Sequence, residues 1–376
     1  MNRDKLANML NILPLKNTII FESSPDLTDN SYYLFKYLVE NYHIQDRYKL
    51  VWFMYDYSKR QDTLCDVPIT CVDNNSKSTG IVTKLKRLYY NFTAKAIIDS
   101  NMFVYKKRNK QIRIYADHGM PLKEPVVYLS NIGKCDLVSV AGDFFKDIYG
   151  KYTDRDSIQV MGLPRDEALL NKDRSNSCVK KILWMPTFRQ HKNRKGEPEN
   201  IFPFGVPVAK TTEDFEKLNN SLKENNMLLL LRLHPAQNTA ILKGVDASNI
   251  VIADNDYLKK NNMMLEDMLV DSDALITDYS SVYYDYMFTG NPIGLTFEDV
   301  DLYKETCDLV FDDIVKDMTG RLIWNMEDLL AFVNEINMNI DEYKKEREDF
   351  CEKIGMRKMH SCKLISEFLM SKLGEF

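Results

Sequence analysis

Two short polar stretches carry side chains suited to acid–base chemistry and to phosphate binding. His118 follows the strand-like run Ile112–Ala116 and precedes a glycine, so an imidazole stands beside exposed backbone. An imidazole titrates near neutral pH and can take a proton from a hydroxyl. Two adjacent hydroxyls, Ser280 and Ser281, come directly before a helical pattern, and a helix start offers free N–H groups and a positive dipole end to an anion. These residue types suit a phosphate-bearing ligand and the removal of a proton from a hydroxyl.

Two further stretches add positive charge at the ends of strand-like runs. Alternation along a strand places Arg232 and His234 on one side of the chain. Another strand-like run ends at Met185-Pro186 and is followed by Thr187 and Arg189. Read singly, each of these residues also fits a cap, a turn or a surface loop. Their shared position after strands favours one phosphate site, although the sequence has no Gly-x-Gly-x-x-Gly, no Walker loop and no kinase signature.

The elements that must position these residues alternate along the chain. Short β-branched and apolar runs read as strands, and helical patterns separate them. Such alternation predicts an α/β fold with parallel sheets covered on both faces, and these sheets bind ligands beyond the carboxyl ends of their strands. We expect an N-terminal domain over 1–175, a second domain over 176–340 and a C-terminal helical segment over 341–376.

Composition limits the class of protein. The chain has 376 residues, 44% hydrophobic and 28% charged, which is typical of a soluble globular protein. No apolar run approaches the length of a membrane span, and the N-terminus has no signal-peptide pattern. Seven scattered cysteines without a C-x-x-C indicate a reducing cytoplasm. Two D-x-D pairs, Asp254/Asp256 and Asp271/Asp273, are interpreted as turn and cap residues, so we expect no metal.

Charge is unevenly distributed over the chain. The net charge is −5, yet residues 1–177 are net positive by five. Basic residues concentrate between Lys84 and Arg113, beginning with Lys84, Lys86 and Arg87, and aromatic residues are interleaved. Such a segment suits an anionic membrane surface, and it also fits an ordinary solvated helix face. No nucleic-acid-binding motif is visible, so we expect no nucleic-acid partner.

These stretches together resemble the CDP-glycerol glycerophosphotransferase family, which contains the primases and polymerases of teichoic-acid-like polymers. The resemblance covers about residues 19–329. Its signature stretches are His118-Gly-Met-Pro-Leu-Lys123, Gly162-Leu-Pro-Arg-Asp166, Met185-Pro-Thr-Phe-Arg189, Arg232-Leu-His-Pro235 and Asp273-Ala-Leu-Ile-Thr-Asp-Tyr-Ser-Ser281.

The resemblance implies a GT-B fold, in which two Rossmann-like domains face each other across a cleft. It implies transfer of glycerol phosphate from CDP-glycerol, or a related CDP-polyol, to a hydroxyl of a lipid-linked or glycan acceptor, with release of CMP. This would serve teichoic-acid or capsule synthesis by a cytoplasmic enzyme at the inner face of the membrane, with no cofactor. His118 would be the base, Asp278 would orient the serine turn, and the donor would be held by Thr187, Arg189, Arg232, His234, Ser280 and Ser281.

One signature departs from the family pattern. Members usually carry Trp-His-Gly-Thr, where this chain has Asp117-His118-Gly119-Met120. The carboxylate of Asp117 either raises the pKa of His118 and orients it, or points to the other face of the strand. Three other functions stay open: a GT-B glycosyltransferase using a nucleotide sugar, a CDP-ribitol-using variant, and a non-catalytic scaffold of a wall-polymer complex.

Overall fold

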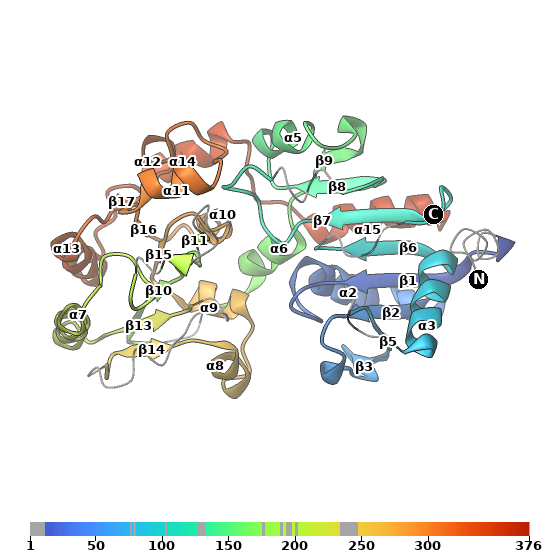
Figure 1. The fold of residues 1–376 in the computed structure, drawn as a ribbon, viewed down its shortest axis with the longest axis horizontal. Helices are drawn as coiled ribbons and strands as arrows, with labels where there is room; N and C mark the ends of the chain where they lie inside the picture. The colour runs from blue at the N-terminus through green and yellow to red at the C-terminus, as the bar shows by residue number, and fades with distance from the viewer. Residues whose placement is uncertain are drawn as a thin grey trace. The chain divides into compact units, whose positions relative to one another are not determined.

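The chain divides into two compact units, each built on its own parallel sheet (Figure 1). Unit 1 comprises Met1–Met120, Pro125–Ala168 and Ile354–Phe376, and unit 2 comprises Pro121–Glu124 and Leu169–Lys353. The computed structural model describes residues 12–75, 77, 80–101, 104, 106–125, 129, 132–174, 177–188, 191–192, 198–199, 202–233 and 247–375.

Unit 1 contains a seven-stranded parallel sheet. Its spatial order is β5-β2-β1-β6-β7-β8-β9, so the chain runs outward from β1 to β5, returns beside β1 and then runs the other way. The parallel arrangement predicted from the alternating pattern is confirmed. The strands are β1 (Lys16–Glu22), β2 (Lys49–Met54), β5 (Thr70–Asp73), β6 (Ala94–Asp99), β7 (Ile112–Ala116), β8 (Leu137–Val140) and β9 (Ile158–Val160).

Helices cover both faces of this sheet because its strands are apolar on both sides. Ile19 and Phe21 of β1 pack into a core with α2 and α15, while the intervening Ile20 packs into a second core that contains Tyr90 of α3. α15 comes from the end of the chain and contacts α2 and β7. The unit 1 helices are α2 (Asp29–Tyr42), α3 (Ile81–Thr93), α5 (Asp143–Tyr149) and α15 (Ser361–Leu373), and α6 (Pro164–Asn171) begins in this unit.

Unit 2 repeats the plan with a six-stranded parallel sheet. Its order is β14-β13-β10-β15-β16-β17, so the chain again starts at a central strand and reverses beside it. The strands are β10 (Lys180–Trp184), β13 (Met227–Leu231), β14 (Ile250–Ile252), β15 (Ala274–Thr277), β16 (Ile293–Leu295) and β17 (Arg321–Leu322).

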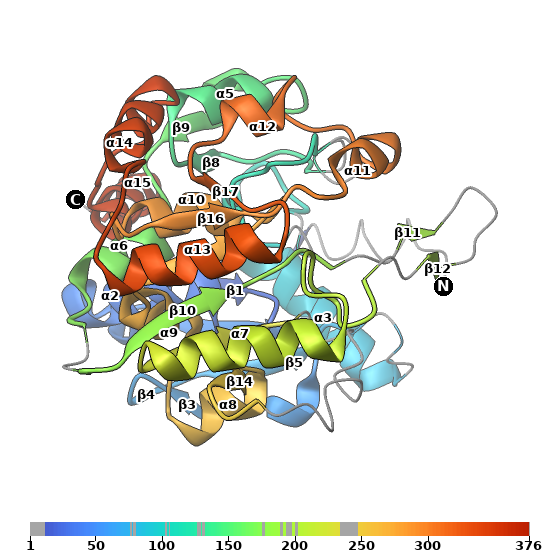
Figure 2. The same cartoon turned by 90° about the vertical axis from the view of Figure 1, so that its left-hand side faces the viewer.

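One face of the unit 2 sheet is covered by α7 and α13, which lie side by side (Figure 2) and share a core with β10 and β13. α7 begins with a capping box in which Thr211 Oγ1 accepts from Asp214 N at 3.1 Å and Asp214 Oδ2 accepts from Thr211 N at 2.9 Å. The unit 2 helices are α7 (Thr212–Glu224), α8 (Asn255–Lys260), α9 (Leu265–Asp271), α10 (Val282–Met287), α11 (Val300–Thr306), α12 (Ile314–Asp317), α13 (Met326–Asn337) and α14 (Lys344–Lys353).

Two small hairpins and the last helices complete the described chain. β3 (Thr63–Leu64) pairs with β4 (Val67–Pro68), and β11 (His191–Lys192) pairs with β12 (Pro198–Glu199). The segment expected as one C-terminal helical unit contains two helices, of which α14 belongs to unit 2 and α15 to unit 1. All seven cysteines are free.

The strand orders locate where each unit can bind a ligand. In an open α/β sheet, ligands bind beyond the carboxyl ends of the strands at the point where the strand order reverses. That point lies between β1 and β6 in unit 1 and between β10 and β15 in unit 2.

Candidate active-site residues

The reversal point of unit 2 carries the turn that contains the two candidate serines. β15 ends at Thr277, and Asp278 follows with its side chain fully buried. Both carboxylate oxygens of Asp278 accept from the backbone N–H of Thr187, at 2.9 and 3.2 Å, and one also accepts from Tyr279 N at 2.6 Å. Asp278 therefore joins the ends of two neighbouring strands, β10 and β15.

Ser280 and Ser281 lie beyond this carboxylate at the start of α10. Both are half-buried, and Ser280 Oγ accepts from Val282 N at 3.4 Å. α10 has only six residues, so its dipole adds little to anion binding. The hydroxyls and nearby N–H groups remain the main groups that this turn offers to a phosphate.

Arg232 follows β13, the other neighbour of β10. Its half-buried guanidinium donates to Ala253 O at 2.8 Å and to the side-chain oxygen of Asn255 at 3.0 Å. Burial lowers the pKa of Arg232 below its ordinary value, against the opposing effect of Asp254. Two strand spacings, roughly 10 Å, separate the ends of β13 and β15. Arg189 and His234 lie outside the described residues.

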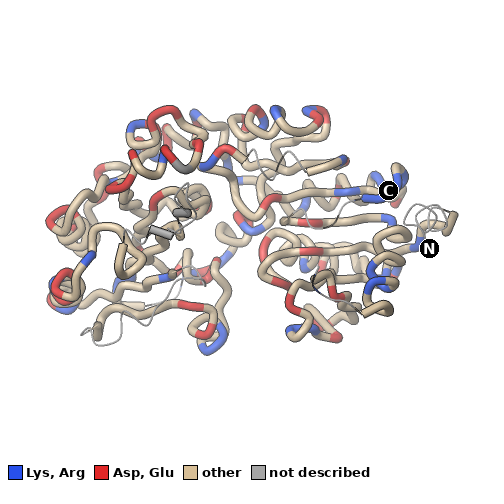
Figure 3. The backbone as a smooth tube through the Cα atoms, in the orientation of Figure 1, with Lys and Arg blue, Asp and Glu red and all other residues tan. Residues whose placement is uncertain are grey.

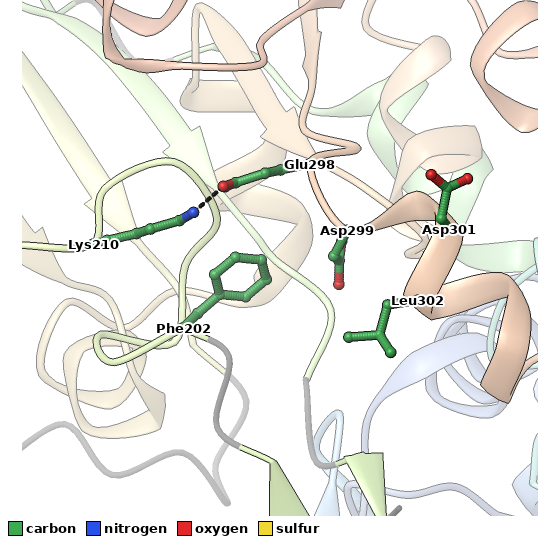
Figure 4. Close-up of a pocket in the computed structure, with 6 residues that line it drawn as sticks. All are labelled: Phe202, Lys210, Glu298, Asp299, Asp301 and Leu302. Atoms are coloured by element: carbon green, nitrogen blue, oxygen red, sulfur yellow. Dashed lines mark ion pairs between the residues drawn. The ribbon is translucent and has the colours of Figure 1, made fainter.

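A cavity of about 350 Å³ opens in unit 2 after β16 (Figure 4). Asp299 accepts from Tyr279 Oη at 3.2 Å, which links the cavity to the residue after Asp278. Glu298 pairs with Lys210, while Asp301 points away from them in Figure 4. The carboxylates that line the cavity suit a ligand with hydroxyl or amino groups and disfavour a phosphate. The lining residues are Phe202, Lys210, Glu298, Asp299, Asp301 and Leu302.

In unit 1, His118 follows β7, beside the reversal point of that sheet. Its Nδ1 lies 2.8 Å from Oδ1 of Asp117, whose side chain is fully buried, while about half of the imidazole is exposed. Desolvation alone would lower the pKa of His118, but the charge and contact of Asp117 outweigh it and raise the pKa to about 9. Of the two orientations left open for Asp117, the structure has the one in which it faces the histidine.

Sequence reasoning missed the side chains that hold the backbone at His118. Asn30 Nδ2 donates to Asp117 O at 2.6 Å, and its Oδ1 accepts from Arg165 N at 2.9 Å. The guanidinium of Arg165 donates to His118 O and to Asp29 Oδ1, the latter at 3.1 Å. Arg165 belongs to the Gly162–Asp166 signature, which was the one signal available; Asn30 lies 87 residues before Asp117 and carried none.

The basic region separates into surface and core residues. Lys84 and Lys86 are exposed on α3, and the half-buried Arg87 donates to Asn75 O at 3.3 Å. Figure 3 marks the basic positions along the backbone in blue. Arg113, the last residue of the predicted basic stretch, is fully buried, and its Nε lies 2.9 Å from Oδ2 of Asp99. The surface charge is therefore smaller than the sequence count suggested, because part of it neutralises a buried carboxylate.

α3 also presents apolar side chains that composition did not reveal. Ile81, Val82, Leu85 and Tyr89 are 76, 78, 52 and 40% exposed. At about 100° per residue they fall within one arc of roughly 100°, and Lys84 and Lys86 lie on either side of that arc. In the described residues, no helix is both long and apolar enough to cross a membrane.

Both aspartate pairs have structural roles. Asp254 caps α8 by accepting from Asp256 N at 3.0 Å and Tyr257 N at 2.9 Å. Asp273 accepts from Lys181 N at 2.8 Å and pairs with Arg174 at 2.5 Å. Asp271 lies 3.9 Å from Lys181. Asp254 is therefore a helix cap, as interpreted, while Asp271 and Asp273 contact Lys181 and Arg174.

The family follows from comparison with known sequences. The model of the CDP-Glycerol:Poly(glycerophosphate) glycerophosphotransferase family matches residues 6–356. The chain belongs to this glycerophosphotransferase family. It is similar to the teichoic acid glycerol-phosphate primase of Bacillus subtilis (strain 168), with 28% identity over 67% of each chain. It is also similar to the teichoic acid glycerol-phosphate transferase of Staphylococcus aureus (strain NCTC 8325 / PS 47), with 24% identity over 92% of this chain and 90% of that one.

Solved structures show the fold of this glycerophosphotransferase family member. The wall teichoic acid polymerase TagF matches with a TM-score of 0.71 and 19% identity, over 99% of this chain and 94% of that chain. A putative UDP-N-acetylglucosamine 2-epimerase from Listeria monocytogenes matches with a TM-score of 0.57 and 12% identity, over 96% and 98%. The fold implied by the resemblance, GT-B with two Rossmann-like units, is confirmed.

Proposed function

We propose that this protein transfers glycerol phosphate from CDP-glycerol to a hydroxyl group of a lipid-linked or glycan acceptor and releases CMP. Family membership and relatives that are teichoic acid glycerol-phosphate primases and transferases support this activity. The observation that carries it at the level of residues is the turn ordered by Asp278, which sets two hydroxyls at the reversal point of the unit 2 sheet.

The reaction is a displacement at phosphorus. The acceptor oxygen forms a bond to the β-phosphorus of the donor, and the bond from that phosphorus to the bridging oxygen breaks, so CMP leaves with the bonding electrons. His118 accepts the proton of the attacking hydroxyl. The Asp117 carboxylate makes the imidazole a stronger base while reducing the unprotonated fraction at neutral pH.

Unit 2 supplies the groups that hold the diphosphate. Arg232 contributes a guanidinium, and Ser280 and Ser281 contribute hydroxyls, with Thr187 and Asp278 fixing the turn. By resemblance, Arg189 and His234 add positive charge. Loss of one such contact to a developing negative charge costs on the order of 2–4 kcal/mol of transition-state stabilisation. Arg232, Arg189 and His234 supply positive charge to the diphosphate in place of a metal ion. We therefore expect the activity to survive a chelator.

The exposed surface of α3 supports a lipid-linked acceptor and a location at the membrane. Its exposed apolar arc flanked by lysines has the pattern of a helix that lies in the interface of an anionic membrane. A lipid-linked acceptor at the inner face of the membrane would bring the substrate to such a helix. We therefore infer a peripheral protein of the cytoplasmic face.

A donor panel tests the function most completely. The protein is incubated with CDP-glycerol, CDP-ribitol and UDP-sugars in the presence of a glycan acceptor, and CMP or UDP release is followed with and without chelator. We expect CMP release from CDP-glycerol that the chelator leaves unchanged. Release of UDP instead would establish a glycosyltransferase, and absence of release from every donor would favour a scaffold.

CDP-ribitol is the second candidate donor. A teichoic acid poly(ribitol-phosphate) polymerase of Bacillus spizizenii (strain ATCC 23059 / NRRL B-14472 / W23) shares 29% identity over 43% of this chain. The glycerol-phosphate relatives match more of the chain, which favours glycerol. A kcat/KM ratio for the two donors settles the preference.

A further inference from the structure

The buried carboxylate of Asp117 stands where the family usually has an apolar side chain, and the structure shows how it is accommodated. A buried ionised group is costly unless it is paired and hydrogen-bonded. Asp117 is fully buried. Its Oδ1 forms an ion pair with His118 Nδ1 at 2.8 Å but accepts no hydrogen bond within the described residues, and its Oδ2 accepts from the hydroxyl of Tyr149. The two oxygens thus have different partners from different parts of the chain.

Tyr149 is itself held in place. It is the last residue of α5, and its side chain is fully buried. α5 begins where Phe144 N donates to Ile354 O at 3.2 Å, and a Cβ at Gly142 would come within 2.5 Å of that same oxygen. The start of α5 therefore packs so closely on the returning C-terminal segment that only glycine fits at position 142.

We propose that Tyr149 is a positioning residue, which fixes the Asp117 carboxylate so that its other oxygen holds Nδ1 of His118 and directs Nε2 to the acceptor hydroxyl. This rests on the proposed function, because it assigns Tyr149 a part in proton removal by His118. The chain runs from the Tyr149 hydroxyl through both oxygens of Asp117 to the imidazole. It is the arrangement of a base oriented by a third group.

The other charged groups near the imidazole do not replace this chain. Asp29 raises the pKa of His118 and Arg165 lowers it, and these two pair with each other at 3.1 Å. Arg165 reaches the histidine through its backbone oxygen, and Asn30 reaches Asp117 in the same way. They fix the backbone, whereas Tyr149 is placed to fix the carboxylate.

The test compares Tyr149→Phe with Tyr152→Phe, which removes a hydroxyl from a half-buried tyrosine three residues further along. In Tyr149→Phe we expect kcat for CDP-glycerol to fall about fivefold, the equivalent of one hydrogen bond, with an unchanged donor KM. The Nδ1 proton resonance of His118, assigned with a His118→Ala variant, should shift or broaden. Tyr152→Phe should leave kcat, the donor KM and the Nδ1 resonance of His118 unchanged.

A double-mutant cycle separates positioning from general stabilisation. If Tyr149 acts through Asp117, Tyr149→Phe should have no further effect on kcat in an Asp117→Asn background. Additive losses, or an unaltered His118 resonance in Tyr149→Phe, would overturn the proposal. The resonance is measured without substrate, so a protein that shows the shift but never releases CMP from CDP-glycerol would refute the proposed function alone.

Discussion

At the scale of single residues, the acid–base properties of the molecule centre on His118. Half of its imidazole is exposed, yet a fully buried carboxylate lies 2.8 Å from Nδ1. That neighbour stabilises the protonated ring and raises the pKa to about 9. The chemistry proposed here needs the unprotonated ring, so the two facts together define a pH dependence.

The transfer rate should rise with pH. Below about 9 most His118 is protonated, so the reactive fraction grows about tenfold per pH unit and levels off above that value. In Asp117→Asn the midpoint should fall toward 6.5, the ordinary value for histidine, and the maximal rate should also fall. A kcat–pH profile of both proteins checks this. A rate that decreases between pH 7 and 9 in the unmodified protein would mean that the protonated ring is the active form.

Asp278→Asn should weaken both the fold of unit 2 and donor binding. The amide has one accepting oxygen where the carboxylate has two, so a charge-assisted bond to Thr187 N is lost. We expect the free energy of unfolding to drop by about 1.5–3 kcal/mol and the KM for CDP-glycerol to rise. Urea denaturation and CMP-release kinetics measure the two effects.

Asp256→Asn is the matched control, because that side chain is exposed on α8 and forms an ion pair with Lys259 at 3.6 Å. This substitution should change the free energy of unfolding by no more than about 0.5 kcal/mol. Equal effects of the two substitutions on unfolding and on donor KM would show that Asp278 does not order the turn.

At the scale of secondary structure elements, α3 joins the fold to the proposed membrane surface. Tyr90 packs the helix into a core of unit 1, and a different arc of the helix leaves four large apolar side chains exposed. Exposed apolar side chains gathered on one helix indicate an interaction site. The flanking lysines are the reason for proposing an anionic lipid surface as its partner.

Ile81→Glu/Leu85→Glu should release the protein from vesicles containing anionic lipid, because it places two carboxylates within the apolar arc. Lys84→Glu/Lys86→Glu should weaken binding in a salt-dependent manner. Vesicle sedimentation measures both, and Glu213→Lys on α7, an exposed residue of unit 2, is the control. Vesicle binding that survives both double substitutions would exclude α3 as the membrane contact.

α15 contributes to the stability of unit 1 through its buried face. Ile365, Leu369 and Met370 are buried in the core shared with α2 and the sheet. Leu369→Ala should lower the free energy of unfolding by about 2–5 kcal/mol. Met338→Ala, at a side chain that is 59% exposed, should leave it nearly unchanged. Denaturant titration of the two variants compares them, and similar midpoints would contradict the packing described for α15.

Periodicity predicted the elements well where the apolar pattern was strong and poorly where pairing decided the outcome. β7 has the bounds of the predicted run Ile112–Ala116, because its β-branched and aromatic residues are typical of a buried strand. β5 carries Thr-Cys-Val-Asp, which is too short and mixed to signal a strand without its partner β2. The Tyr149–Asp117 contact spans 32 residues, a separation that no local pattern reports.

At the scale of the whole molecule, two parallel sheets each place polar side chains beyond strand ends that lie at, or next to, the point where the strand order reverses. Unit 1 contributes an imidazole backed by a buried carboxylate, and unit 2 contributes an ordered hydroxyl turn and a guanidinium. The proposed reaction divides in the same way, into proton removal and diphosphate binding.

That division is tested most directly by His118→Ala. Calorimetry should give a CDP-glycerol affinity within about twofold of the unmodified protein, while CMP release in the presence of acceptor should fall at least a hundredfold. Normal CMP release by this variant, or a loss of donor affinity that matches the loss of rate, would contradict the assignment of proton removal to His118.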